Sequence, residues 1–315
     1  MIRQFIFVFV LVLVSTVGFA QQENQFTQFM YNQLYLNPGY AGARGIPYFT
    51  ALYRNQWTGF KGAPQSKLLS FNAPLFGDRV GFGLTISNHT QGIENKWDAT
   101  MAYSYNIAIT KESGVRFGLQ GSFRYQGIDF NDPSVEINDP GDPSILYDEE
   151  LNKYNGNFGV GIYANIKQTY FGISVPHFFP SELGINPNNI PEIARTYSHF
   201  YLMAGTMVPL TKGIKFKPSI LAKYVQNAPF DLDVNASLLF NETFTAGLSY
   251  RLGGDGGGDS VDLLALYQVN SVGIGIAYDI SLSEIKQTSS GSFEILLKYD
   301  FIKERSDMAN PRFFF

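Results

Sequence analysis

Residues 271–281 read Ser-Val-Gly-Ile-Gly-Ile-Ala-Tyr-Asp-Ile-Ser, and the strict alternation in this stretch decides the fold. Large apolar side chains take the even positions from Val272 to Ile280, and small or polar residues take the odd positions from Ser271 to Asp279. Successive side chains of a β-strand point to opposite faces of the sheet. One face of this strand therefore suits lipid, and the other suits a polar lumen.

The same division recurs along the chain, and charged residues such as Arg116, Glu294 and Lys298 fall on the polar face. It predicts an all-β, transmembrane, antiparallel up-and-down β-barrel of about 14 strands over residues 48–301. A soluble sandwich or barrel shares this period but turns its apolar face inward, so other features must decide. The expected strands lie near 48–55, 66–74, 79–89, 96–109, 114–127, 155–166, 168–176, 197–209, 214–226, 230–240, 243–252, 259–269, 271–281 and 292–301.

The start of the chain predicts export. Arg3 precedes an apolar run over 5–14, and the small residues Gly18 and Ala20 frame a cleavage site before Gln21, so residues 1–20 resemble a secretory signal peptide. The mean hydropathy of −0.06 argues against a helical membrane protein. The chain has no Cys, so neither a lipoprotein Cys nor a disulfide is available. With 28 Phe, 19 Tyr and only 16% charged residues, the composition fits a barrel in the outer membrane.

The lengths of the connections give an orientation. Bacterial barrels have tight periplasmic turns and longer external loops. Long connections at 56–65 and 128–154 alternate with tight ones at 75–78, 110–113 and 241–242. The parity places both ends of the barrel, and therefore both termini of the mature chain, in the periplasm.

Two segments lie outside the predicted barrel. In the N-terminal segment 21–47, Phe26, Met30 and Leu34 have helical spacing, and Asn37–Pro38 would end the turn. We expect a short plug-like helix in or under the periplasmic mouth. The periplasmic C-terminal tail 302–315 ends in three Phe residues, which are costly to leave in water, so we expect them to dock on the barrel rim or on a partner.

Signs of chemistry are sparse. The histidines His89, His177 and His199 are dispersed, and no spacing indicates a metal site. Ser87 and His89 share a lumenal face, but a third orienting group is not assigned, so a hydrolase is disfavoured. We predict no catalytic residue, cofactor or metal.

Two loops have weak alternative interpretations. Residues 128–154 are acidic, with Asp139-Pro-Gly-Asp142 as a possible Ca²⁺ turn, although a solvated acidic loop is favoured over an ion site. The glycines of 253–258 are followed by no Lys and open no helix, so a flexible external loop is favoured over a phosphate site.

Specific strings indicate a family. Residues 28–42 read Gln-Phe-Met-Tyr-Asn-Gln-Leu-Tyr-Leu-Asn-Pro-Gly-Tyr-Ala-Gly, residues 53–60 read Tyr-Arg-Asn-Gln-Trp-Thr-Gly-Phe, and 81–89 read Gly-Phe-Gly-Leu-Thr-Ile-Ser-Asn-His. These strings, with the terminal Asn310-Pro-Arg-Phe-Phe314, closely resemble the PorP/SprF family of type IX secretion system membrane proteins. The resemblance covers essentially the whole mature chain and implies a source in the Bacteroidetes.

The resemblance implies a non-enzymatic outer-membrane protein that supports secretion or surface attachment of a cargo protein. The resemblance leaves two roles open: a core component attached to periplasmic type IX components, or the dedicated partner of one secreted adhesin. Cargo of the second kind carries a type B C-terminal domain, and gliding motility depends on some such pairs. Outer-membrane lipid is the remaining partner. No nucleic-acid partner is expected. The alternative is a porin or uptake channel for small solutes. The residues matching the family motifs, with the terminal aromatics, are candidates for partner contact: Tyr31, Asn32, Asn37, Pro38, Gly39, Gly42, Arg54, Gln56, Trp57, Asn310, Pro311, Arg312, Phe313, Phe314 and Phe315.

Several of these residues also have a purely structural interpretation. Asn37-Pro-Gly39 and Gly42 suit turns, with Pro fixing φ and Gly taking positive φ, or a periplasmic docking element. Trp57 suits an interfacial anchor, and Arg54 suits a lumen residue paired with a carboxylate, or both hold cargo. A closed barrel has no free strand edge, so cargo should engage external loops, the lumen mouth or periplasmic segments.

Overall fold

The polar and apolar faces predicted from the sequence close into a barrel in the computed structural model, which describes residues 24–110, 112–133, 150–182, 195–226, 228–253 and 258–301. The predicted fold class is confirmed: β10 pairs with both β7 and β12, and β1 pairs with β17, so the antiparallel wall is continuous. The predicted signal peptide, most of the acidic loop, the glycines at 254–257 and the C-terminal tail lie outside the described residues.

The wall corresponds to 14 barrel strands. Although β10 and β11 are separate elements, only Met207 lies between them and both pair with β12, so together they form one strand of the wall. A separate two-stranded sheet joins β8 (Ser181–Glu182) to β9 (Arg195–Thr196). The strands of the wall are β1 (Tyr48–Asn55), β2 (Gln65–Leu75), β3 (Val80–Gln91), β4 (Glu94–Ala108), β5 (Ser113–Asp129), β6 (Glu150–Ile166), β7 (Thr169–Val175), β10 (His199–Thr206), β11 (Val208–Thr211), β12 (Ile214–Val225), β13 (Asp231–Phe240), β14 (Phe244–Leu252), β15 (Gly258–Val269), β16 (Val272–Ser281) and β17 (Ser292–Asp300).

The alternation of burial along the strands shows which face is which. Along β16, Ile274 and Ile276 are half exposed on the outer surface, whereas Ala277 and Asp279 are buried inside. The same arrangement holds on β17, where Ile295 and Leu297 face outward and Glu294 and Lys298 face the lumen. An apolar exterior around a polar interior is the pattern of a barrel that spans a membrane.

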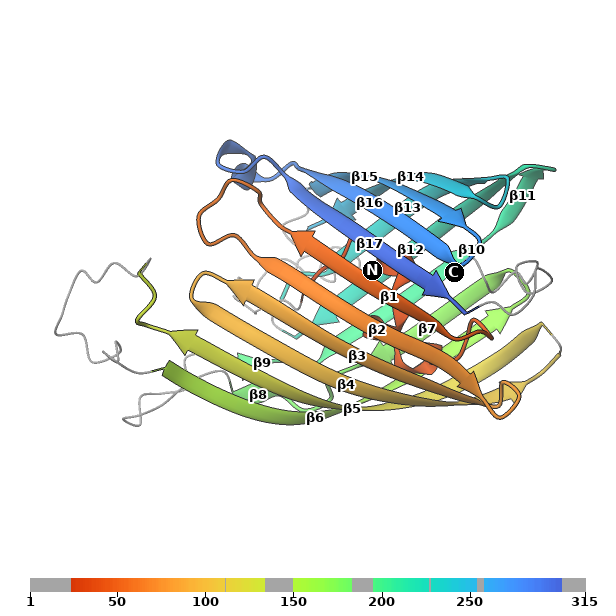
Figure 1. The fold of residues 1–315 in the computed structure, drawn as a ribbon, viewed down its shortest axis with the longest axis horizontal. Coiled ribbons are helices and arrows are strands. Elements are labelled where there is room, and N and C mark those ends of the chain that lie inside the picture. The colour runs from red at the N-terminus through yellow and green to blue at the C-terminus, as the bar shows by residue number, and fades with distance from the viewer. Residues whose placement is uncertain are drawn as a thin grey trace, which may run out of the picture.

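The two ends of the barrel differ in their connections (Figure 1). At one end the connections have at most four residues, as in 76–79, and left-handed backbone at Lys167, Asn241 and Asn270 makes the tight turns that the sequence predicted. The other end carries the longer connections 56–64, 130–149, 176–198 and 282–291, along with the tight turn 92–93. We refer to these ends as the short-turn mouth and the long-loop mouth.

Among the described residues, helical structure is confined to short pieces: η1 (Phe29–Tyr31), α2 (Gln33–Leu36), η2 (Pro38–Tyr40) and η3 (Glu284–Gln287). The N-terminal segment was expected to hold a short helix ended by Asn37–Pro38, and α2 does end at Leu36, but the helical turns of the segment are divided into three pieces. It is divided because the backbone leaves the helical region at Asn32 (φ −135°, ψ 50°) and is extended at Asn37 (φ −144°, ψ 113°). Within the described residues, none of the helices is long and apolar enough to cross a membrane.

Candidate functional site

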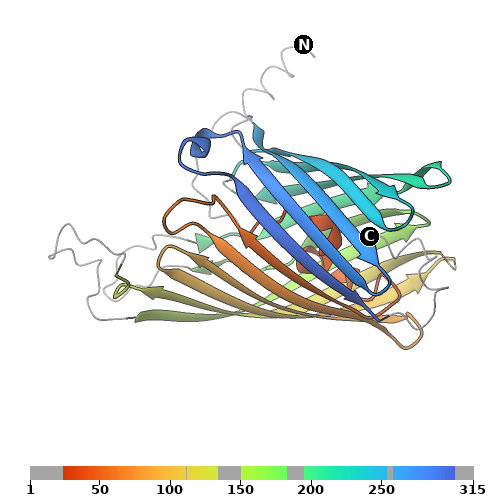
Figure 2. The same cartoon turned by 45° about the horizontal axis from the view of Figure 1, so that its top comes forward.

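Residues 24–47, here called the threaded segment, run through the lumen from one mouth to the other (Figure 2). At the long-loop mouth, Gln25 Nε2 donates to Asp231 Oδ2 at 2.5 Å, and Asp231 is the first residue of β13. At the short-turn mouth, Arg44 forms a salt bridge of 2.6 Å with Asp300, the last residue of β17. The sequence predicted a plug-like segment in or under the periplasmic mouth, whereas the structure places the two ends of the segment at opposite mouths.

The threaded segment fills the lumen. Its apolar side chains are buried against the wall, from Phe26 and Phe29 to Leu34 and Tyr40, although they occupy the interior of a polar barrel. Among the described residues, the cavity between the start of the segment and strands β10, β12 and β13 has a volume of only about 20 Å³. That volume accommodates roughly one water molecule.

Asn37 fixes the middle of the segment. Its Oδ1 accepts from the Gly39 N–H at 2.8 Å, which caps η2, and its Nδ2 donates to the Ile162 carbonyl at 3.0 Å. Pro38 occupies the first helical position, where its missing N–H costs nothing. Asn37 therefore forms the turn predicted from the sequence and also attaches that turn to β6.

The glycines of the motif have two different roles. Gly42 adopts φ +69°, as predicted for a turn glycine. Gly39 has no positive φ, so that part of the prediction is wrong. A Cβ on Gly39 would lie 2.9 Å from the Tyr163 nitrogen, which makes close approach to the wall the reason for glycine there.

Glycines of the wall complete these close approaches. A Cβ on Gly81, Gly118 or Gly161 would overlap atoms of the threaded segment, namely the Ala41 carbonyl oxygen, the Gly39 nitrogen and Asn37 Oδ1. Inward-facing glycines are a signal in the sequence that could have indicated a segment packed inside the barrel. Taken alone, the two-residue period does not reveal it.

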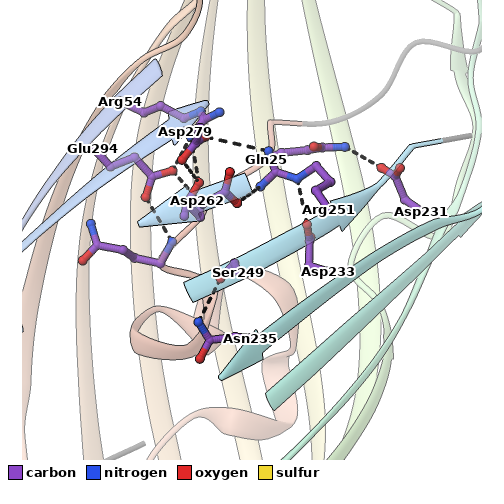
Figure 3. Close-up of polar contacts among 12 residues, drawn as sticks. Gln25, Arg54, Asp231, Asp233, Asn235, Ser249, Arg251, Asp262, Asp279 and Glu294 are labelled. Carbon is purple, nitrogen blue, oxygen red and sulfur yellow. Dashed lines mark hydrogen bonds and ion pairs between the residues drawn. The ribbon is translucent and has the colours of Figure 1, made fainter. Parts of the chain in front are cut away.

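Arg54 is the centre of a buried polar cluster at the long-loop mouth (Figure 3). One guanidinium nitrogen lies 2.7 Å from Asp279 Oδ2 and 2.7 Å from Glu294 Oε1. Glu294 also accepts from the Thr27 N–H at 2.6 Å and from the Gln28 N–H at 3.1 Å. The arginine therefore orients the carboxylate that holds the start of the threaded segment. This is the carboxylate-paired lumen position that the sequence suggested.

The cluster continues around the lumen on β12 to β15. Arg251 Nε donates to Asp233 Oδ1 at 2.7 Å, and the Lys223 ammonium lies 2.7 Å from the other oxygen of Asp233. Arg251 also lies 3.9 Å from Asp262, which is fully buried. Buried charges are costly unless they are paired. The pairing compensates the charges that strands β12 to β15 bury at the inner face of the wall.

The remaining family-motif residues lie in two places. Tyr31 and Asn32 are buried within the threaded segment, and the Lys217 ammonium lies 5.3 Å from the centre of the Tyr31 ring. Gln56 and Trp57 belong to the connection after β1, where the Trp57 N–H donates to Ser292 Oγ at 3.1 Å. Asn310, Pro311, Arg312 and Phe313 to Phe315 lie outside the described residues.

The Ser–His pair considered from the sequence does not form. His89 Nδ1 lies 2.9 Å from the hydroxyl of Ser66 on β2, and the structure gives no hydrogen bond between His89 and Ser87. Within the described part of the chain, no three His, Asp or Glu side chains are placed to hold a metal ion.

The closed wall, its apolar exterior and its polar interior define the class: a transmembrane β-barrel whose lumen is occupied by a segment of its own chain. The chain belongs to the family of type IX secretion system membrane proteins PorP/SprF, which its sequence matches over residues 18–299. The resemblance noted in the sequence is thus confirmed. Family and fold together point to the outer membrane, with partners in the secretion system and the membrane.

Two solved structures show what the chain is similar to in fold. The TodX deltaS2S3 mutant monoaromatic hydrocarbon channel is similar with a TM-score of 0.51 and 11% identity, over 90% of this chain and 96% of that one. The outer membrane protein Omp33 of Acinetobacter baumannii gives a TM-score of 0.45 and 6% identity, over 82% of this chain and 100% of that one. No curated protein sequence matches the chain.

Proposed function

We propose that this protein is a non-enzymatic outer-membrane component of the type IX secretion system that supports secretion or surface attachment of a cargo protein. It is either a core component attached to periplasmic type IX components or the dedicated partner of an adhesin with a type B C-terminal domain, the branch on which gliding motility depends in some cases. The observation that carries the proposal is the threaded segment: a barrel sealed by its own chain is suited to holding partners at its mouths rather than to passing solutes.

The alternative is a porin or uptake channel. A porin needs a water-filled lumen. Here the threaded segment crosses the lumen from Gln25, which donates to Asp231 at one mouth, to Arg44, which forms a salt bridge with Asp300 at the other. A solute would have to displace it. The sealed lumen therefore favours a partner-binding role over diffusion.

The orientation assigns the partners to opposite sides. Bacterial barrels carry their longer loops outside, so the long-loop mouth faces the cell surface and cargo. The short-turn mouth, where β17 ends, then faces the periplasm and its type IX components, and the tail 302–315 follows from it. The start of the described chain, at Gln25, then lies at the external mouth.

The test is affinity purification of the tagged protein from crosslinked native cells, with the co-purifying proteins identified by mass spectrometry. Recovery of a large secreted adhesin is the expected result for a dedicated cargo partner, and recovery of periplasmic type IX components is expected for a core component. Recovery of the barrel alone would contradict the secretion role.

Planar bilayer recording tests the alternative directly. The purified barrel should be nearly silent, because the threaded segment leaves no open path. Steady ion conductance by the unmodified protein without partners would favour the porin.

A further inference from the structure

The outer wall carries one row of side chains that marks the edge of the membrane near the long-loop mouth. The strand register aligns Tyr53, Lys67, Asn88 and Trp97 across β1 to β4, and the row continues through Tyr125 and Tyr154 on β5 and β6. Aromatic girdles of this kind lie at the level of the lipid headgroups. The ammonium of Lys67 is therefore held at headgroup level.

Within the described part of the chain, Lys67 has no counter-ion. Its side chain is exposed on the outer surface, and among the described residues no hydrogen bond or ion pair reaches its ammonium. Charges on the strands otherwise face the lumen, apart from those at strand ends such as Asp259. A cation at the lipid surface is stabilised by an anionic headgroup.

A depression lies directly beside this lysine on the side of the membrane core. It has a volume of about 420 Å³, within the range of about 300–1,000 Å³ typical of small-molecule pockets. Its floor is Ala51, which stands between Leu69 and Leu297 in the register and leaves room where its neighbours are large. Leu69, Ile86 and Ile295 form apolar walls, while Lys67, Asn88 and Trp97 lie on its headgroup side.

We propose that this depression is a binding site for one anionic, phosphate-bearing lipid. The phosphate contacts Lys67 beside Asn88, and an acyl chain lies over Ala51. The position of the charge relative to the apolar hollow matches a lipid, whose anionic group lies at the interface and whose chains enter the membrane core. The site is separate from the lumen and does not depend on the proposed secretion role.

A second depression on the same wall provides a natural comparison. It has a volume of about 380 Å³ and is lined by Ala99, Met101, Gly121, Phe123 and Phe158 among others, with no charged residue in its lining. An apolar hollow alone would bind lipid equally well at both places. A site that also binds the anionic headgroup requires the charge of Lys67, so it is expected only at the first depression.

The test is native mass spectrometry of the purified full-length barrel in detergent after incubation with phosphorylated lipid A, phosphatidylglycerol or diacylglycerol. One anionic lipid should remain bound, and Lys67→Met should weaken its binding about fivefold, the effect of losing one cation at a lipid surface. Ala51→Leu should abolish binding with the charge intact. Lys61→Met, in the exposed connection after β1, and Ala99→Leu, in the second depression, are matched controls that should leave binding unchanged.

Lipid A and phosphatidylglycerol together show which class of outer-membrane lipid supplies the phosphate. Retention of lipid A alone would assign the site to lipopolysaccharide, and retention of phosphatidylglycerol as well would assign it to anionic phospholipid in general. Equal binding of diacylglycerol, or equal loss with Lys67→Met and Lys61→Met, would overturn the proposal. No retained lipid in the unmodified protein would overturn it as well.

Discussion

At the scale of a single residue, Arg54 has two roles: its guanidinium compensates the buried carboxylates of the wall, and it holds the threaded segment. It is buried, it contacts Asp279 and Glu294, and it donates to Thr27 Oγ1 at 3.1 Å. Removing one partner of a buried ion pair leaves an uncompensated charge, which typically costs about 3–5 kcal/mol. Its pairing with carboxylates could be anticipated from the strand parity alone. Its contact with Thr27 could not, because the sequence does not place the segment beside it.

We therefore predict that Arg54→Met lowers the free energy of unfolding by about 3–5 kcal/mol. The measurement is urea unfolding of the reconstituted barrel followed by tryptophan fluorescence and by heat-modifiable gel mobility. Lys96→Met is the matched control, since the Lys96–Glu94 pair is partly exposed and exposed pairs contribute about 0–1 kcal/mol. Equal effects of the two substitutions would mean that the cluster does not stabilise the fold.

At the scale of elements, the strands of the wall were predictable from the sequence, but the path of the threaded segment inside the barrel was not. Strand β2 was expected near 66–74 and spans Gln65–Leu75, because alternation and turn residues are local signals. The spacing of Phe26, Met30 and Leu34 correctly indicated helical turns. It gave neither their division at Asn32 and Asn37 nor their depth in the lumen. Those features depend on contacts with residues more than a hundred positions away, such as that between Asn37 and Ile162.

The packing of η2 against β5 gives an element-scale prediction. Gly118 faces the lumen, and a Cβ there would overlap Gly39 and Pro38. Gly118→Ala should displace the threaded segment, lower the free energy of unfolding by about 1–3 kcal/mol, and convert a silent barrel into a conducting one in planar bilayers.

Gly121, on the same strand, provides the control for this substitution. A Cβ on Gly121 would find only Phe158 Cε1, at 4.0 Å, so Gly121→Ala should leave both stability and conductance unchanged. The fraction of heat-modifiable protein shows whether each variant folds. A folded and silent Gly118→Ala variant would refute the view that this contact seals the lumen.

At the scale of the whole molecule, the threaded segment makes the two ends of the described chain differ in position. Pro47 and Phe301 share a backbone hydrogen bond of 3.0 Å at the short-turn mouth, so the barrel itself begins and ends on one side. Thr27 bonds to Glu294 at the long-loop mouth, across 267 positions of sequence. Strands from both ends of the chain contact the segment. Folding therefore has two possible orders: the wall closes around the segment, or the segment enters a barrel that is already closed.

This path predicts where a tag will be found in cells. An epitope inserted between Gln22 and Glu23 should be accessible to antibody and to added protease on intact cells, because the chain enters the lumen from the long-loop mouth. An epitope following Phe315 should become accessible only after the outer membrane is permeabilised, since β17 ends at the short-turn mouth.

A third epitope within residues 254–257 is the control, because it reports the side on which the long connections lie. If that loop tag is exposed while the N-terminal tag is protected, the segment enters from the periplasm and the threaded arrangement does not exist in the cell. If the loop and N-terminal tags are exposed together, the start of the mature chain is part of the surface that meets secreted cargo.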